Sequence, residues 1–96
     1  MQAQNSVLNA EQSFNGRFIM PHISIKMLEG RTDEQKKNAA EALKKALCEA
    51  IGCGEKHVSV SVSDFTAEEW QEQYRIEIAE NPDIVITPDY KPEDLL

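Results

Sequence analysis

The pair Met20-Pro21 is a possible source of chemistry. A proline inside a chain has an amide nitrogen that cannot take up a proton. If translation begins at Met20 and that methionine is removed, Pro21 becomes a free secondary amine. Burial in an apolar pocket disfavours the charged form of an amine and lowers its pKa, which would suit Pro21 to act as a general base. The commoner role of a proline at such a position is to begin a strand.

Few other side chains form a pattern with an evident chemistry. Arg31 precedes a predicted helix, where a cation is electrostatically unfavourable, and this favours a functional role. His22 either contacts the base or substrate, or is a polar residue on the exposed side of a strand. Cys48 and Cys53 form neither a metal pattern nor a disulfide framework, so we expect reduced thiols. The sequence has no Ser/His/Asp set, phosphate-binding loop or metal cluster, and we expect no cofactor and no metal.

A predicted strand–helix–strand unit positions these residues. Polar and apolar residues alternate over 22–27, the period of a strand with one buried face. Thr32 and Gln35 form a capping box that begins a helix, and Gly52 ends it. Valines alternate with serines over 58–63, which predicts a second strand. The helix and its short joins make a right-handed crossover between the two strands, so we expect them to be parallel. The apolar stripe predicted for the helix comprises Ala39, Ala40, Leu43, Ala46, Leu47, Ala50 and Ile51.

The C-terminal half predicts a second, shorter helix. A capping box starts at Thr66, and Phe65 with Trp70 makes a hydrophobic staple across it. The helix should run from about Ala67 to Ala79, and 84–86 is a possible short third strand. The predicted fold class is therefore α/β, with two parallel strands, a second shorter helix and a short C-terminal strand.

Composition limits both the size and the partners of the protein. With 96 residues the chain forms one domain at most. A domain this small has a marginal core of its own, so we expect self-association. The formal net charge of -7 argues against nucleic acid and anionic membranes as partners. No apolar run is long enough to span a bilayer. We expect a cytoplasmic protein.

The first nineteen residues differ from the rest of the chain. Residues 1–19 are rich in Gln, Asn and Ser, show no sustained apolar period, and lack the features of a secretory signal. The sequence Gly16-Arg17 can be encoded as a ribosome-binding site ahead of the Met20 codon. We interpret 1–19 as disordered or as upstream sequence outside the natural protein, and 20–96 as the functional domain.

The segment 21–36, PHISIKMLEGRTDEQK, resembles the opening of the 4-oxalocrotonate tautomerases. Those enzymes begin with a catalytic proline, followed by a strand, an L-E-G-R turn and a D-E-Q-K helix start. The similarity extends to about Trp70. It implies that Pro21 is the catalytic base. It also implies that Arg31 binds and polarises the carboxylate or carbonyl end of the substrate, often from a neighbouring subunit.

The chain also departs from this family's pattern. Ser59 stands where the family has a second arginine, so one carboxylate contact is missing. Trp70 aligns with the aromatic wall of the family's pocket, although the staple would explain it equally well. The spacing of Trp70, Tyr74 and Tyr90 resembles the dimeric branch of the superfamily. The resemblance thus implies a homodimer or a higher even oligomer.

The resemblance predicts a cofactor-independent isomerase of the tautomerase type. It would interconvert the enol and keto forms of a small 2-oxo or 2-hydroxydienoate acid. Pro21 and Arg31 would be catalytic, and Arg31, Ser59 and Trp70 would bind the substrate. Two alternatives stay open: a hydratase or dehalogenase-type relative with Pro21 as general acid, and a non-catalytic oligomerisation module that keeps the fold.

Overall fold

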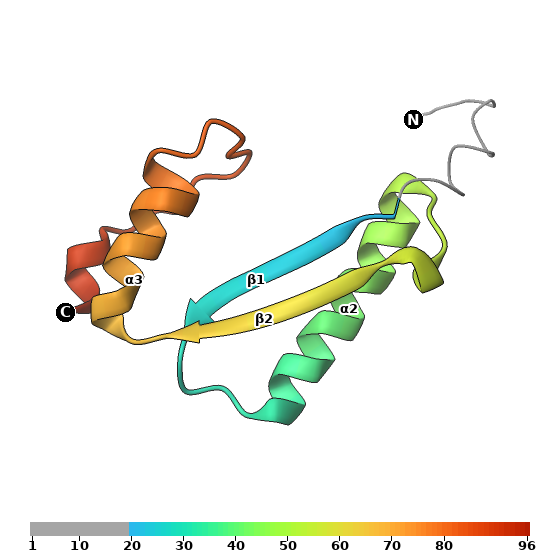
Figure 1. Ribbon diagram of the computed structural model, residues 1–96, viewed down its shortest axis with the longest axis horizontal. Coiled ribbons are helices and arrows are strands. Elements are labelled where there is room, and N and C mark those ends of the chain that lie inside the picture. The colour runs from blue at the N-terminus through green and yellow to red at the C-terminus, as the bar shows by residue number, and fades with distance from the viewer. Residues whose placement is uncertain (1–19) are drawn as a thin grey trace. The chain divides into compact units, whose positions relative to one another are not determined.

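The computed structural model describes residues 20–96, and the predicted upstream segment 1–19 lies outside the described residues. The main elements are β1 (His22–Leu28), α2 (Asp33–Ile51), β2 (Ser59–Phe65) and α3 (Ala67–Tyr74) (Figure 1). A π-helical turn, Arg75–Ala79, continues α3, and short 3-10 turns cover Glu55–His57 and Pro92–Leu95. These elements confirm the α/β class and the predicted extent of both helices.

The two strands pair directly and in parallel, with both arrows pointing the same way in Figure 1. Backbone hydrogen bonds hold both ends of the pair. The Ser59 N–H donates to the Pro21 carbonyl at 3.2 Å, and the Glu29 N–H donates to the Phe65 carbonyl at 2.9 Å. The serines of β2 are exposed whereas its valines are half-buried, as the alternation predicts. The sheet therefore has one polar face and one apolar face.

The described residues fall into two compact units, 20–25 with 31–62 and 26–30 with 63–96. In the first, helix α2 begins at Thr32, whose side chain accepts from the Gln35 N–H while the Gln35 side chain accepts from the Thr32 N–H. The helix ends at Gly52 in the left-handed conformation, with φ 73°. Both predicted helix boundaries are confirmed.

Only part of the stripe predicted for α2 is covered within one chain. Leu43 and Ile51 keep 42% and 48% of their surface exposed. Cys48, which the prediction left out of the stripe, is the one hydrophobic side chain that counts as buried within 20–96, at 9% exposed. The reason is physical: a two-stranded sheet is too narrow to cover a helical face of this width.

The second unit is organised around α3. The capping box at Thr66 and Glu69 is present as predicted. The Lys26 ammonium, on β1, lies 2.6 Å from Glu77 and 3.2 Å from the side-chain oxygen of Gln73. Lys26 thereby ties its strand to the end of α3 and to the π-helical turn.

The predicted third strand over 84–86 is wrong for the single chain. Val85 and Ile86 are 92% and 82% exposed, and the Ile84 N–H donates to the Asn81 carbonyl in a turn. The β-branched residues favour a strand, but a strand also needs the backbone of a neighbour. Within the described part of the chain, the sheet consists of β1 and β2 alone.

Candidate functional site

Pro21 lies immediately before β1 and is half-buried. Its carbonyl accepts the Ser59 N–H, so the start of β2 fixes the position of Pro21. Met20, bonded to its nitrogen, is 61% exposed and has a φ of 49°. That left-handed conformation is unusual for a bulky residue. A proline that follows restricts its neighbour further, towards extended backbone. The Met20–Pro21 junction is therefore strained.

Ser59 lies beside His22 on the polar face of the sheet. The Ser59 hydroxyl is 2.7 Å from His22 Nδ1, and His22 Nε2 is 3.2 Å from the Ser61 hydroxyl. Both ring nitrogens are therefore within hydrogen-bond distance of a serine hydroxyl, which can donate or accept. His22 is exposed, as one of its two interpretations required. The predicted site residue Ser59 is thus connected through His22 to Ser61.

Sequence reasoning missed this cluster of His22, Ser59 and Ser61. The alignment of the two predicted parallel strands would have indicated it. Parallel strands that start together at Pro21 and Ser59 place alternate residues of both strands on the same face. Pairing the polar set of the first strand with the serines of the second would have predicted the contact.

Arg31 lies beyond the opposite end of β1 from Pro21, in the connection that leads to α2. The seven residues of β1 span about 23 Å at roughly 3.3 Å per residue. This separation is far beyond the reach of one arginine side chain. Pro21 and Arg31 of the same chain therefore do not meet.

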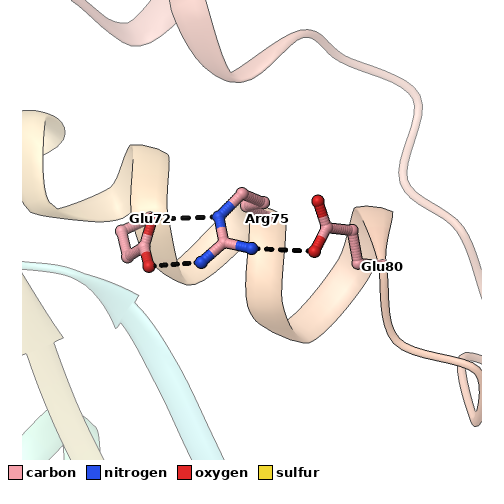
Figure 2. A network of polar contacts seen from close by, with 3 residues as sticks. All are labelled: Glu72, Arg75 and Glu80. Carbon is pink, nitrogen blue, oxygen red and sulfur yellow. Dashed lines mark hydrogen bonds and ion pairs between the residues drawn. The ribbon is translucent and has the colours of Figure 1, made fainter.

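Arg31 is nevertheless available for a ligand. It is exposed, and within residues 20–96 its guanidinium pairs with no carboxylate. Arg75 provides the contrast, because its guanidinium lies between Glu72 and Glu80 (Figure 2), with nitrogen–oxygen distances of 2.5, 3.0 and 2.7 Å. These two carboxylates raise the pKa of Arg75 above its ordinary value, and Arg75 lowers the pKa of Glu72. Arg75 is thus neutralised locally, whereas Arg31 is not.

Trp70 belongs to an aromatic cluster within the second unit. Its ring centroid lies 6.2 Å from that of Phe65, which confirms the predicted staple. The Trp70 indole N–H donates to the Tyr90 hydroxyl at 2.8 Å, and the Tyr74 and Tyr90 rings meet edge to face at 5.6 Å. The Gln71 side chain donates to the Pro92 carbonyl at 2.8 Å. These contacts give Trp70 a packing role, and its role as a pocket wall stays a prediction.

A hollow of about 220 Å³ lies between α2 and β2 in the first unit. Ala40, Glu41 and Lys44 line it from the helix, Val60 from the strand, and Val58 from the residue just before the strand. None of the predicted site residues is part of this lining. Within residues 20–96, no helix combines the length and apolar character that crossing a membrane requires.

Comparison with known proteins identifies the family. The family model described as tautomerase enzyme matches residues 21–73. A 2-hydroxymuconate tautomerase from Bacillus subtilis (strain 168) is 44% identical over 46 residues, covering 48% of this chain and 74% of the relative. Another 2-hydroxymuconate tautomerase, from Comamonas testosteroni, is 45% identical over 51 residues, and the match covers 53% of this chain and 81% of the relative.

A solved structure supports the same conclusion. It is that of a protein described as a 4-oxalocrotonate tautomerase, from methicillin-resistant Staphylococcus aureus. The two chains are 31% identical and superpose with a TM-score of 0.50, and the match covers 51% of this chain and 79% of the other. The family match begins at Pro21, the residue before β1, and extends through both strands into α3. The chain therefore belongs to the tautomerase family and is an isomerase.

Proposed function

We propose that this enzyme interconverts the enol and keto forms of a small 2-oxo or 2-hydroxydienoate acid, with the amine of Pro21 as general base. The observation that carries the proposal is the position of Pro21. The family match starts at this residue, and the Ser59 N–H fixes its carbonyl at the start of the sheet. The relatives named 2-hydroxymuconate tautomerase support the substrate class.

The reaction needs only one proton to move. The free amine of Pro21 takes a proton from the enol hydroxyl or from a carbon next to the carbonyl, and returns it at another carbon. The substrate is isomerised and the amine is regenerated, so no cofactor is consumed. The cation of Arg31 holds the anionic end of the substrate and stabilises the negative charge that develops during proton transfer.

The base exists only after processing at Met20. In the 96-residue chain the Pro21 nitrogen is an amide, which has no basicity. We therefore propose that 1–19 are not part of the active enzyme, whose domain is 20–96 with Met20 cleaved.

Assembly completes the proposed site. Since Pro21 and Arg31 of one chain lie at opposite ends of β1, a site that contains both takes its arginine from another protomer. Apolar surface is available for the contact: Leu43, Val85 and Ile86 are all exposed. We propose a homodimer or a higher even oligomer. Sedimentation of a stable monomer at micromolar concentration would contradict it.

The experiment compares two forms of the protein in the ketonisation of phenylenolpyruvate and 2-hydroxymuconate. The form that starts at Pro21 should be active, and the 96-residue form should have lost the roughly 10²- to 10⁴-fold contribution of a general base. Equal activity of the two forms would exclude the proline mechanism. Intact mass and N-terminal sequencing of the natively expressed protein identify the form that cells contain.

Arginine variants test the proposed role of Arg31 in binding the substrate. Arg31→Ala should lower kcat/KM by about 10²-fold, the loss of one contact made to developing charge. The matched control is Arg75→Ala, which removes another exposed arginine, one that already forms ion pairs with Glu72 and Glu80. Its activity should be unchanged. An Arg31→Ala enzyme with full activity would remove Arg31 from the site.

A further inference from the structure

Two thiols that the proposed reaction does not use lie in contact at the end of α2. Cys48 is on the last turn of the helix, and Cys53 follows the helix by two residues. Their sulfur atoms are 3.0 Å apart and share a hydrogen bond. Neither takes part in a disulfide. A thiol pair at this distance needs only a small movement to form a covalent bond.

The helix terminus produces this contact. Gly52 has a φ of 73°, and its N–H donates to the Cys48 carbonyl at 2.8 Å. This left-handed cap turns the chain back on the helix. The next side chain, that of Cys53, is therefore directed towards Cys48. The pairing depends on local backbone geometry within the first unit and needs no rearrangement of its sheet.

The two thiols differ in access, and the surroundings of Cys48 make it a weaker acid than an ordinary thiol. Cys48 is buried, and its hydrogen bond with Cys53, together with that burial, raises its pKa to about 11. Glu55 adds to the increase, whereas Lys44 opposes it. Cys53 is only half-buried. An oxidant in solution thus reaches Cys53 first, and Cys48 is held beside the product.

We propose that Cys48 and Cys53 form a reversible dithiol–disulfide site, oxidised by a low-molecular-weight disulfide such as oxidised glutathione. The Cys53 thiolate attacks one sulfur of glutathione disulfide, forming a mixed disulfide and releasing one glutathione thiolate. Cys48 then loses its proton to solvent and attacks the Cys53 sulfur, which displaces the second glutathione. In total, two protein thiols become one disulfide and one glutathione disulfide becomes two glutathiones.

The new bond would tie the end of α2 to the connection before β2. That connection contains the turn Glu55–His57 and leads directly to Ser59, whose N–H holds the Pro21 carbonyl. The dithiol site therefore lies on the segment that sets the start of β2. Its oxidation can be followed without any measurement of tautomerase activity.

The test treats the full 96-residue protein with glutathione disulfide, alkylates remaining thiols with N-ethylmaleimide and measures intact mass. The wild-type protein should lose two hydrogen atoms, carry neither glutathione nor maleimide, and regain both thiols with dithiothreitol. Peptide mapping should place the bond between Cys48 and Cys53.

Two single variants provide matched controls. Cys48→Ala should stop at one glutathione on Cys53, because the resolving thiol is absent. Cys53→Ala, a change at a half-exposed position, should take up no glutathione, because Cys48 is buried. The latter variant tests the order of attack even if Cys48→Ala perturbs folding. Wild-type protein that stays unmodified, that retains glutathione, or that forms disulfides between chains would overturn the proposal.

Discussion

Mixing two impaired forms of the enzyme should restore activity if each site combines Pro21 of one chain with Arg31 of another. The first form is the 96-residue chain, which has Arg31 but an amide at Pro21. The second form starts at Pro21 and carries Arg31→Ala. Unfolding both in urea and refolding them as an equal mixture lets the protomers assort at random.

The expected recovery follows from the geometry of β1. The strand separates the two groups of one chain by about 23 Å, so no chain supplies both to one site. Each site then has an even chance of a free amine and an independent even chance of an arginine. About one quarter of all sites in the mixture should be intact, for a dimer or a higher oligomer alike.

The assay is ketonisation of phenylenolpyruvate, with rates compared before and after co-refolding. The matched control mixes the second form with a 96-residue chain that also carries Arg31→Ala, and no recovery is expected from it. A mixture no faster than the sum of its parts would refute the reasoning. It would mean that Arg31 acts within its own chain or does not act at all.

Other variants test separate parts of the structure. Because Ser59 brings no charge, the wild-type enzyme should prefer monocarboxylate enols, and a preference for the diacid would contradict this. Ser59→Arg should improve kcat/KM for 2-hydroxymuconate relative to phenylenolpyruvate by about 10-fold, the gain expected from one charge-assisted contact. Tyr90→Phe should lower the free energy of unfolding by about 1 kcal/mol, because it removes the hydrogen bond from the Trp70 indole. In a Trp70→Phe background, which already lacks that bond, Tyr90→Phe should lower it no further, and an undiminished loss in urea would contradict the shared bond. The pKa of Cys48 is higher in the folded protein, at about 11, than its ordinary value of 9.0. Stability that this thiol contributes is present below pH 9 and is lost as pH rises towards 11, so the urea midpoint should fall across this range for wild-type protein and less for Cys48→Ser.

Sequence reasoning predicted the features that short segments determine by themselves. The capping boxes at Thr32 and Thr66 depend on residues three positions apart, and both formed as predicted. The staple of Phe65 and Trp70 is equally local. The alternation along β2 is determined by the two-residue period of a strand, so its exposed and half-buried faces could be predicted.

The errors and omissions concern what a segment packs against. Residues 84–86 have the composition of a strand but no neighbour to pair with in one chain. The apolar stripe of α2 is wider than the surface that its own sheet offers, which leaves Leu43 exposed. The contact of Cys48 with Cys53 depends on the direction in which Gly52 turns the chain. The spacing of the two cysteines around Gly52 indicates that a turn lies between them, but it does not give the direction in which the Cys53 side chain points.

The sparse burial within one chain has a practical consequence for measuring this enzyme. Cys48 is the one hydrophobic side chain that counts as buried between residues 20 and 96. If a protomer with so little interior assembles as proposed, its stability depends on protein concentration. Specific activity should then decline when the enzyme is diluted for assay, and should recover on concentration. Rates measured at one dilution would describe the fraction assembled as much as the chemistry of the site.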